Sequence, residues 1–253
     1  MENKKNGFDY SCIPLGYYDD IALRKKGIRS FWHHLKFKRI IESFNGKYES
    51  ILDIGCFGGT FLGMIPEITF KEQAGIDILK DQIEYANKKY ATEFRKFYLM
   101  EDFTKDGFFD DGYFDVITLI EVIEHLTYPQ ISEIIHFAFN KLKPNGRLII
   151  TTPNYTSTWP LMELILNHVS NIKYEEQHIT KFNYFNVFNK LEKIMPEFSE
   201  MFQTNFKTTT HLLTPLIASI SFSAADRISS AVSPSRWKIP LGSLILFQLQ
   251  KKV

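Results

Sequence analysis

The sequence is short of cysteine, of long apolar runs and of net charge. Its two cysteines, Cys12 and Cys56, are too few for a disulfide framework and are typical of a reducing compartment. No run of 18 apolar residues occurs, and the polar start MENKKNGFDY lacks the apolar core of a signal peptide. We therefore expect a soluble, cytoplasmic protein. With 30 basic and 29 acidic residues the net charge is +1, so the overall charge attracts neither nucleic acid nor an anionic membrane.

The composition is that of an ordinary globular chain. Its 253 residues are 44% hydrophobic and 23% charged, which is typical of one large domain with additions. Short apolar runs alternate with helical segments: we expect strands at 50–54, 74–78, 94–100, 114–120 and 146–152, and helices at 60–65, 80–90 and 131–142. This alternation predicts an α/β fold with a doubly wound, mostly parallel sheet.

Other segments precede, interrupt and follow this pattern. Residues 1–46 are interpreted as an N-terminal helical cap, because apolar residues recur at helical spacing from about Ile21 to Phe44. The basic residues of that segment are expected to form a solvated face. Residues 47–253 then form the main domain, in which the irregular stretch 153–182 is interpreted as a lid insertion. Beyond it we expect a helix at 184–194, a strand at 201–209, a helix at 212–232 and a closing strand at 242–250.

A glycine-rich turn follows the first expected strand. In an open parallel sheet, ligands bind at the carboxyl ends of the strands. Gly55 and Gly59 let the backbone approach such a ligand, and the amides of the next helix can donate to it. Asp77 ends the second strand, 24 residues after Asp53, where a carboxylate can accept hydrogen bonds from both hydroxyls of a ribose. This spacing fits a dinucleotide equally well, so it does not choose between cofactors.

The amino-acid sequences of five segments distinguish between these cofactors. They are ILDIGCFGGTF (51–61), AGIDI (74–78), MEDF (100–103), FDVITLIEVIEHL (114–126) and LKPNGRLIITTPN (142–154). In this order they closely resemble class I S-adenosylmethionine-dependent methyltransferases. The resemblance implies a seven-stranded Rossmann-like sheet whose last strand is antiparallel, with S-adenosylmethionine as the cofactor.

The resemblance also implies which residues contact each part of the cofactor. Asp53 and Gly55 would hold the turn around the methionine part, with Gly59 at the helix entry and Asp77 on the ribose hydroxyls. Asp102 would accept from the adenine amino group, with Phe103 beside the ring, and Ile120 and Glu121 would lie near the sulfonium.

One residue departs from the family pattern. Phe57 stands where the family usually has its middle glycine, and a side chain there either crowds the ligand or points into the helix layer. Because Gly58 is adjacent, we expect cofactor binding to survive. The alternative is an inactive protein that keeps the fold as a binding module. A nucleotide-dependent oxidoreductase is disfavoured, because the Gly-x-Gly-x-x-Gly spacing is absent.

Two histidines are the candidate catalytic groups. Methyl transfer to a hydroxyl benefits from a general base with a pKa near neutrality, and histidine is the usual choice. His125 follows the fourth expected strand, at the catalytic edge of the sheet. His178 lies in the phrase His-Ile-Thr-Lys-Phe, which is similar to one found in quinone- and glycan-modifying members of the family.

A metal-dependent interpretation competes for the same region. On a helix, Glu121, Glu124 and His125 would share a face, and His178 would complete a divalent metal site. Small-RNA 2′-O-methyltransferases carry a similar set with a later histidine pair, of which only His178 is present here. The near-neutral charge also lacks the basic surface that an RNA backbone needs. The leading prediction therefore contains no metal and no nucleic-acid partner.

The expected acceptor is a small molecule. The layout resembles the quinone- and glycan-biosynthesis branch of the family, so a sugar or polysaccharide precursor is the first substrate class and a prenylated quinone the second. The apolar segment 212–232 either contacts a lipid-linked substrate or, as is more usual, packs on the sheet.

Overall fold

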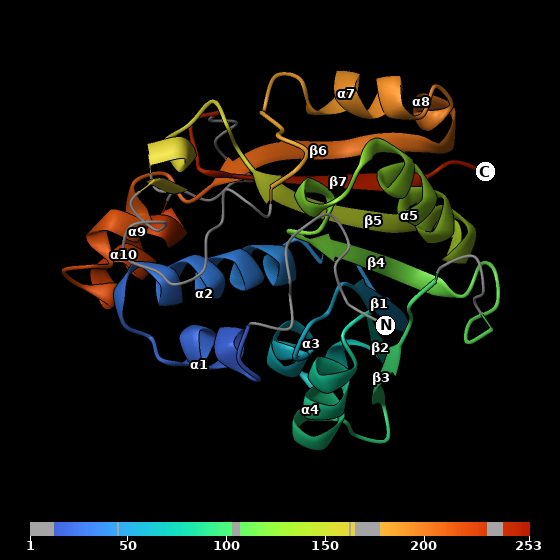
Figure 1. Cartoon of the computed structure of the whole chain (residues 1–253), viewed down its shortest axis with the longest axis horizontal. Coiled ribbons are helices and arrows are strands. Elements are labelled where there is room, and N and C mark those ends of the chain that lie inside the picture. Colours follow the sequence, from blue (N-terminus) through green and yellow to red (C-terminus); the bar gives the residue numbers. More distant parts are fainter. Residues whose placement is uncertain (1–12, 45, 103–106, 162, 165–177, 232–239) are drawn as a thin grey trace.

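The computed structural model describes residues 13–44, 46–102, 107–161, 163–164, 178–231 and 240–253. A seven-stranded sheet lies at its centre, with helices on both faces (Figure 1). The strand order is β3-β2-β1-β4-β5-β7-β6. The strands are β1 (Ser50–Ile54), β2 (Glu72–Asp77), β3 (Arg95–Leu99), β4 (Phe114–Ile120), β5 (Leu142–Pro153), β6 (Phe202–Thr210) and β7 (Leu244–Lys251). The α/β class and the mostly parallel sheet expected from the sequence are confirmed.

The helices follow the expected alternation closely in the first half of the chain. They are α1 (Tyr17–Leu23), α2 (Gly27–Glu42), α3 (Thr60–Met64), α4 (Lys80–Tyr90), α5 (Tyr128–Lys141), α7 (Val187–Ile194), α8 (Phe198–Met201), α9 (Thr214–Ile217) and α10 (Phe222–Ala231). Short 3₁₀ turns occupy Glu67–Thr69 and Ile123–His125. The start of α5 is set by a capping box, in which Gln130 Oε1 accepts from the Thr127 backbone N–H at 3.0 Å.

Strand order reverses beside β1, and this positions the site. From β1 the chain first builds outward through β2 to β3, and then crosses back to place β4 on the other side of β1. Both crossovers are parallel, so the carboxyl ends of β1, β2 and β4 meet at one edge, where ligands bind in folds of this kind. All five residues of β1 are buried, because helices cover both faces of the sheet.

β7 is antiparallel to both of its neighbours, β5 and β6, as the resemblance implied. Its entry is held by Asn154, whose side-chain amide donates to the carbonyl oxygens of Pro240 and Gly242 at 2.9 and 2.8 Å. At Gly242 a Cβ atom would lie 2.2 Å from the Thr210 carbonyl oxygen, so only glycine fits this close approach of two backbones.

β5 begins earlier than expected. The sequence Pro144-Asn145-Gly146 predicts a turn that ends the helix, with the strand starting at Gly146. In the structure β5 starts at Leu142 and the turn becomes a bulge within it, because Phe114 pairs with Leu142 and Val116 with Arg147. Asn145, with φ 63°, supplies the left-handed residue of the bulge.

The N-terminal region contains two helices where the spacing predicts one from about Ile21 to Phe44. The break falls between α1 and α2, where Lys25 and Gly27 have φ values of 48° and 81°. The expected solvated basic face is wrong at two positions. Lys36 and Arg39 are each only 5% exposed: Lys36 pairs with Glu121, and Arg39 donates to the Ser229 carbonyl oxygen.

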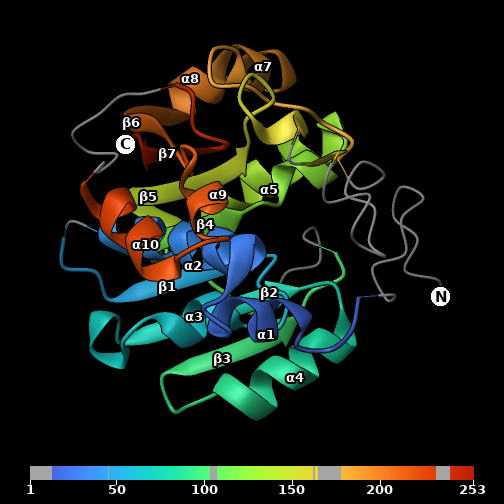
Figure 2. The same ribbon diagram turned by 90° about the vertical axis from the view of Figure 1, so that its left-hand side faces the viewer.

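The segment 212–232 also differs from its prediction. It forms two short helices, α9 and α10, rather than one, and within the described residues they pack on α2 instead of the sheet. The contact joins Phe31 and Leu35 of α2 to Ala218 and Ala225, and the Phe31 ring lies 5.1 Å from that of Phe222. Figure 2 shows α9 and α10 beside α2 at this end of the molecule.

The predicted lid is only partly described by the structure. Of the expected lid 153–182, residues 162 and 165–177 lie outside the described residues. Among the described helices, none has the length and apolar character needed to cross a membrane.

Candidate active site

The loop between β1 and α3 is shaped by two glycines that tolerate no side chain. Gly55 and Gly59 both have φ 77°. A Cβ atom on Gly55 would lie 2.7 Å from Val122, and one on Gly59 would lie 2.8 Å from the Phe97 ring. The backbone N–H groups of Gly55 and Cys56 both donate to the Ile76 carbonyl oxygen, at 2.9 and 3.0 Å. The loop is thereby tied to the end of β2.

Asp77, at the end of β2, holds the same loop from its side chain. Its two carboxylate oxygens accept from the backbone N–H groups of Phe57 at 2.8 Å and Leu79 at 2.9 Å. Burial raises the pKa of Asp77, and these backbone hydrogen bonds oppose that rise. Asp77 therefore anchors the glycine loop as well as facing the cavity described below.

Phe57 continues the loop in a strained backbone conformation. Its φ of 49° lies in the left-handed region that glycine adopts more easily. Its ring packs on Tyr18 of α1, with ring centroids 5.0 Å apart and planes at 74°. The side chain that replaces the family's usual glycine therefore connects the loop to the N-terminal helices.

Asp53 is the most deeply buried carboxyl group of the loop region. It is 2% exposed, and the Thr118 hydroxyl donates to its Oδ1 atom at 2.6 Å. Burial raises the pKa of Asp53 to about 7. A cationic group placed beside this carboxyl would favour its ionised form.

One cavity of about 320 Å³ joins the glycine loop to the segment that follows β4. Seven of the sequence-predicted residues line it: Asp53, Gly55, Asp77, Ile120, Glu121, His125 and His178. Gly59 instead forms the N-cap of α3. Asp102 is half-buried and is not among the lining residues, and Phe103 lies outside the described residues.

Glu121, the residue after β4, is bound by the N-terminal helices. Trp32 Nε1 donates to one carboxylate oxygen at 3.2 Å, and the Lys36 ammonium pairs with the other. Burial alone would raise the pKa of Glu121. The Lys36 charge is the largest of the effects that oppose this rise, and the net pKa lies below the ordinary value, so the group is ionised. The sequence pattern missed Lys36 as a site residue, although its four-residue spacing from Trp32 places the two side chains on one face of α2.

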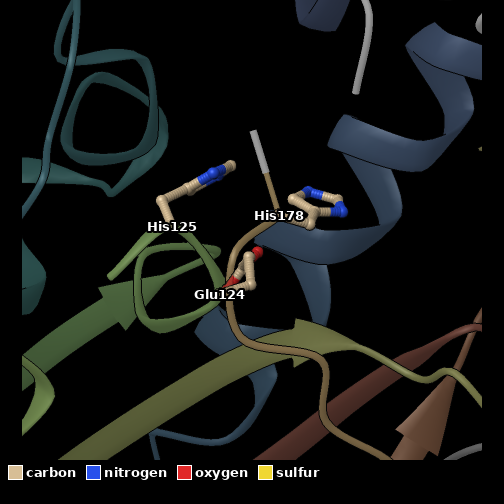
Figure 3. A group of neighbouring side chains, drawn as sticks. All are labelled: Glu124, His125 and His178. Carbon is tan, nitrogen blue, oxygen red and sulfur yellow. The ribbon is translucent and has the colours of Figure 1, made fainter. Parts of the chain in front are cut away.

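Three side chains gather at the other end of the cavity, and Figure 3 shows them. Glu124, His125 and His178 each offer a ligand atom, and these atoms lie within 4.8 Å of one another. The segment carrying His178 is held against the turn after β4 by Thr180, whose N–H donates to the Glu124 carbonyl oxygen at 3.0 Å. Residues separated by more than fifty positions thus meet at one point.

Glu124 is the unusual member of this cluster. It is 1% exposed, and neither of its carboxylate oxygens has a hydrogen-bond partner among the described residues. Burial and then the nearby Glu121 charge raise its pKa well above the ordinary value. Glu121 itself faces α2, so the expectation that Glu121, Glu124 and His125 share one face is wrong. The chain there forms a 3₁₀ turn rather than an α-helix, and Glu121 precedes it with φ 54°.

His178 has a second group of neighbours that the sequence did not indicate. Its Nδ1 atom lies 2.8 Å from Glu163 Oε1 and 2.8 Å from the Tyr155 hydroxyl. Tyr155 also donates to Glu163 Oε1 at 2.9 Å. Both residues belong to the irregular segment after β5, where no periodicity marks an inward-facing position.

Comparison with known proteins agrees with this geometry. A family profile described as a methyltransferase domain matches residues 28–195, which is more than half of the chain. The chain belongs to this methyltransferase family. The chain therefore contains an S-adenosylmethionine-dependent methyltransferase domain, in which Gly55, Asp77 and the end of β4 line the cavity described above.

Curated relatives of the methyltransferase share a common name. The ubiquinone biosynthesis O-methyltransferase of Rickettsia prowazekii is 31% identical over 145 residues, covering 55% of this chain and 56% of that protein. The mitochondrial ubiquinone biosynthesis O-methyltransferase of Saccharomyces cerevisiae is 34% identical over 114 residues, covering 42% and 34%. The chain thus matches about half the length of the first relative and a third of the second.

Solved structures show the same fold at low identity. A S-adenosylmethionine-dependent methyltransferase from Archaeoglobus fulgidus has a TM-score of 0.58 at 20% identity, with 86% of this chain and 92% of that chain covered. The N-methyltransferase NodS of Bradyrhizobium japonicum, in complex with S-adenosylhomocysteine, has a TM-score of 0.54 at 14% identity, with 89% and 88% covered. These similarities concern the fold alone.

Within the methyltransferase, the cavity has two chemically different ends. At one end, the glycine loop, Asp53 and Asp77 place backbone amides and carboxylates at the cavity wall. The far end offers His125, His178 and an unpartnered buried carboxylate, together with the indole rings of Trp32 and Trp159. This second end can take up a proton or hold a divalent cation beside an acceptor.

Proposed function

We propose that this methyltransferase transfers a methyl group from S-adenosylmethionine to a hydroxyl group of a small molecule. The observation that carries the proposal is the single cavity, which runs from the glycine loop to the buried His178 and Glu124. A cofactor held by the loop end and an acceptor held by the histidine end would meet inside it.

The proposed reaction is an in-line displacement in which positioning matters most. The bond between the sulfonium sulfur and the methyl carbon breaks as the acceptor oxygen forms a bond to that carbon. The hydroxyl proton passes to His178, which acts as the general base. Helix α2 covers this point, since Trp32 and Lys36 reach Glu121 at the end of β4, and the exclusion of water favours loss of the sulfonium charge.

The acceptor that we propose is a phenolic hydroxyl of a quinone precursor rather than a sugar. The names of the curated relatives support this choice, and so does the apolar lining of the acceptor end. Trp32 and Trp159 pack together there with ring centroids 4.9 Å apart and planes tilted by 42°, and Leu126 and Ile134 line the same cavity. An aromatic ring fits such a surface better than a polar sugar does.

The test measures methyl transfer from labelled S-adenosylmethionine to a catechol carrying a short prenyl chain and to a panel of sugars. Replacing His178 by alanine should lower kcat by about 10² or more, because the general base is lost. Binding of S-adenosylhomocysteine, measured by calorimetry, should change less than twofold.

A matched histidine control is available on α5. His136 is half-exposed and pairs with Glu197, so His136→Ala should leave both turnover and binding unchanged. Full turnover in His178→Ala would contradict the proposed base. Binding of S-adenosylhomocysteine without turnover on any acceptor would instead favour the inactive binding protein.

The unpartnered Glu124 carboxylate favours a second candidate, a metal-dependent methyltransferase. Two imidazoles and one carboxylate are a ligand set that divalent cations accept, and a buried carboxylate with no hydrogen bond gains most from a cation. A cation bound there would supply Lewis-acid activation of the acceptor hydroxyl. An RNA acceptor for such a site is disfavoured by the net charge of +1.

Calorimetric titration of the protein with manganese or magnesium, without cofactor or acceptor, tests this candidate. Micromolar binding that Glu124→Gln weakens at least tenfold would support it. Turnover that persists in excess EDTA, with no heat of metal binding, would remove it.

A further inference from the structure

The environment of His178 Nδ1 determines which ring nitrogen carries the proton. Glu163 is 6% exposed and lies with Oε1 at 2.8 Å from Nδ1. The Tyr155 hydroxyl donates to the same oxygen, and a hydroxyl and an imidazole beside a buried carboxyl group favour its ionised, carboxylate form. A carboxylate can only accept a hydrogen bond.

The Tyr155 hydroxyl, the other neighbour of Nδ1, has only one hydrogen to give. That hydrogen is directed to Glu163 Oε1, at 2.9 Å, so the phenol oxygen also faces Nδ1 as an acceptor. Two acceptors meet Nδ1, and the arrangement is satisfied only when Nδ1 carries a proton. In a neutral imidazole, Nε2 is then the nitrogen with the lone pair.

The remaining nitrogen is in position to act on the acceptor. His178 lines the cavity, and no hydrogen bond joins its Nε2 atom to any residue that the structure describes. The imidazole is held between rings, with the centroids of His125 and Trp159 at 5.1 and 5.9 Å. Ring packing therefore fixes the position of the imidazole, and Glu163 fixes the proton on Nδ1.

We propose that Glu163 is a positioning residue of this methyltransferase, which through Nδ1 fixes the His178 tautomer whose Nε2 presents a lone pair to the acceptor end of the cavity. The inference rests on the proposed function for the role of Nε2. The tautomer itself is a property of this chain that does not depend on turnover.

The tautomer is read by long-range proton–nitrogen NMR correlation on the full chain labelled with ¹⁵N-histidine, with His178→Ala used to assign the signals. In the wild type, His178 should be protonated at Nδ1. Glu163→Met removes the acceptor, and Glu163→Gln adds an amide that can donate to Nδ1. Both variants should shift His178 towards protonation at Nε2, the form that free imidazole side chains favour in water.

Kinetics on the accepted catechol give the functional readout. In Glu163→Gln and Glu163→Met we expect kcat to fall about tenfold or more while KM changes less than about threefold, in the range seen for partners that orient a histidine. Glu163→Asp should restore the Nδ1 tautomer and part of kcat. Glu192→Gln on the exposed face of α7 is the matched control and should change neither.

Three outcomes would overturn the proposal. They are a wild-type His178 protonated at Nε2, an unchanged tautomer in both Glu163 variants, or a shifted tautomer with unchanged kcat. If one variant fails to bind S-adenosylhomocysteine because it is unfolded, the other decides. Failure of the proposed function is separate: His178→Ala would then keep full turnover, whatever the tautomer of the wild type.

Discussion

Individual residues at the carboxyl ends of the strands have structural as well as ligand-binding duties. The position of Asp77 at the end of β2 predicts a ribose ligand. The sequence gives no indication that its side chain also contacts the backbone of the protein. In the structure it accepts hydrogen bonds from Phe57 and Leu79, so it also keeps the glycine loop closed. We therefore expect loss of the carboxylate to affect cofactor binding twice, through the predicted ribose contact and through the loop.

Asp77→Asn is expected to weaken S-adenosylhomocysteine binding by tenfold or more. The asparagine side chain has one acceptor oxygen instead of two, so one of the two loop N–H groups meets an amide donor. Calorimetry gives the affinity, and circular dichroism shows that the fold is retained. Asp81→Asn, on the exposed start of α4, is the control and should bind normally. Unchanged affinity in Asp77→Asn would contradict this placement of the cofactor.

Local sequence identified only part of the site. Asp53, Gly55 and Asp77 could be predicted, because they belong to short motifs that end strands and their neighbours lie close in the chain. The Lys36–Glu121 pair could not, since it joins residues 85 positions apart and depends on how α2 docks. Glu163 was missed because the segment after β5 has no periodicity that would indicate which side chains face inward.

At the scale of elements, α1 is tied to the sheet region by one buried carboxylate. The Asp19 side chain has no exposed surface, and it binds the Lys89 ammonium and the hydroxyls of Tyr85 and Tyr90, all on α4. Burial raises the pKa of Asp19, but the three partners together lower it by more than burial raises it. The net pKa is therefore below the ordinary value. Because Tyr18 on α1 packs against Phe57, this contact connects α4 through α1 to the cofactor loop.

Asp19→Asn should loosen α1 without unfolding the sheet. The uncharged side chain loses its ion pair with Lys89 and leaves at least one half-buried tyrosine hydroxyl without an acceptor, a cost of about 1 kcal/mol. Hydrogen exchange at residues 17–23 should quicken, and S-adenosylhomocysteine should bind several-fold more weakly. Asp20→Asn, one position along and exposed, should show neither effect. Normal protection of α1 in Asp19→Asn would mean that apolar packing alone holds it.

At the scale of the whole molecule, the sheet could be predicted well and the helices around its far end less well. Alternating apolar runs located β1 to β4, because a strand covered on both faces is apolar along its whole length. The antiparallel β7 came from the resemblance alone. The pairing of α9 and α10 with α2 was missed, since an apolar helix face does not indicate which partner it covers.

At the same scale, the contribution of His211 to stability should fall in mild acid. This residue is 2% exposed, and its Nε2–H donates to the Trp32 carbonyl oxygen at 2.9 Å. Burial lowers the pKa of His211 to about 4, whereas an unfolded chain takes up the proton near pH 6.5. Between these values the unfolded state binds more protons, so lowering the pH removes stability, by up to about 1.4 kcal/mol per pH unit.

Urea denaturation of the wild type and of His211→Gln between pH 7.5 and 4.5 isolates this effect. The free energy of unfolding of the wild type, minus that of the variant, should shrink as the pH falls. Asp53, whose raised pKa of about 7 acts in the opposite direction, is present in both proteins and cancels. A difference that is constant with pH would show that His211 is protonated as easily in the folded protein as in the unfolded one.

The place of β7 also constrains the order in which the chain can fold. β7 lies between β5 and β6, and both of these precede it in the sequence. Until β7 arrives, β6 has no partner in the sheet and β5 presents an open edge, the kind of surface through which folding intermediates associate. Completion of the sheet is therefore a late and long-range step of folding. The exposed polar residues of β6, Gln203, Thr204 and Asn205, are suited to keeping that waiting strand from pairing with another copy.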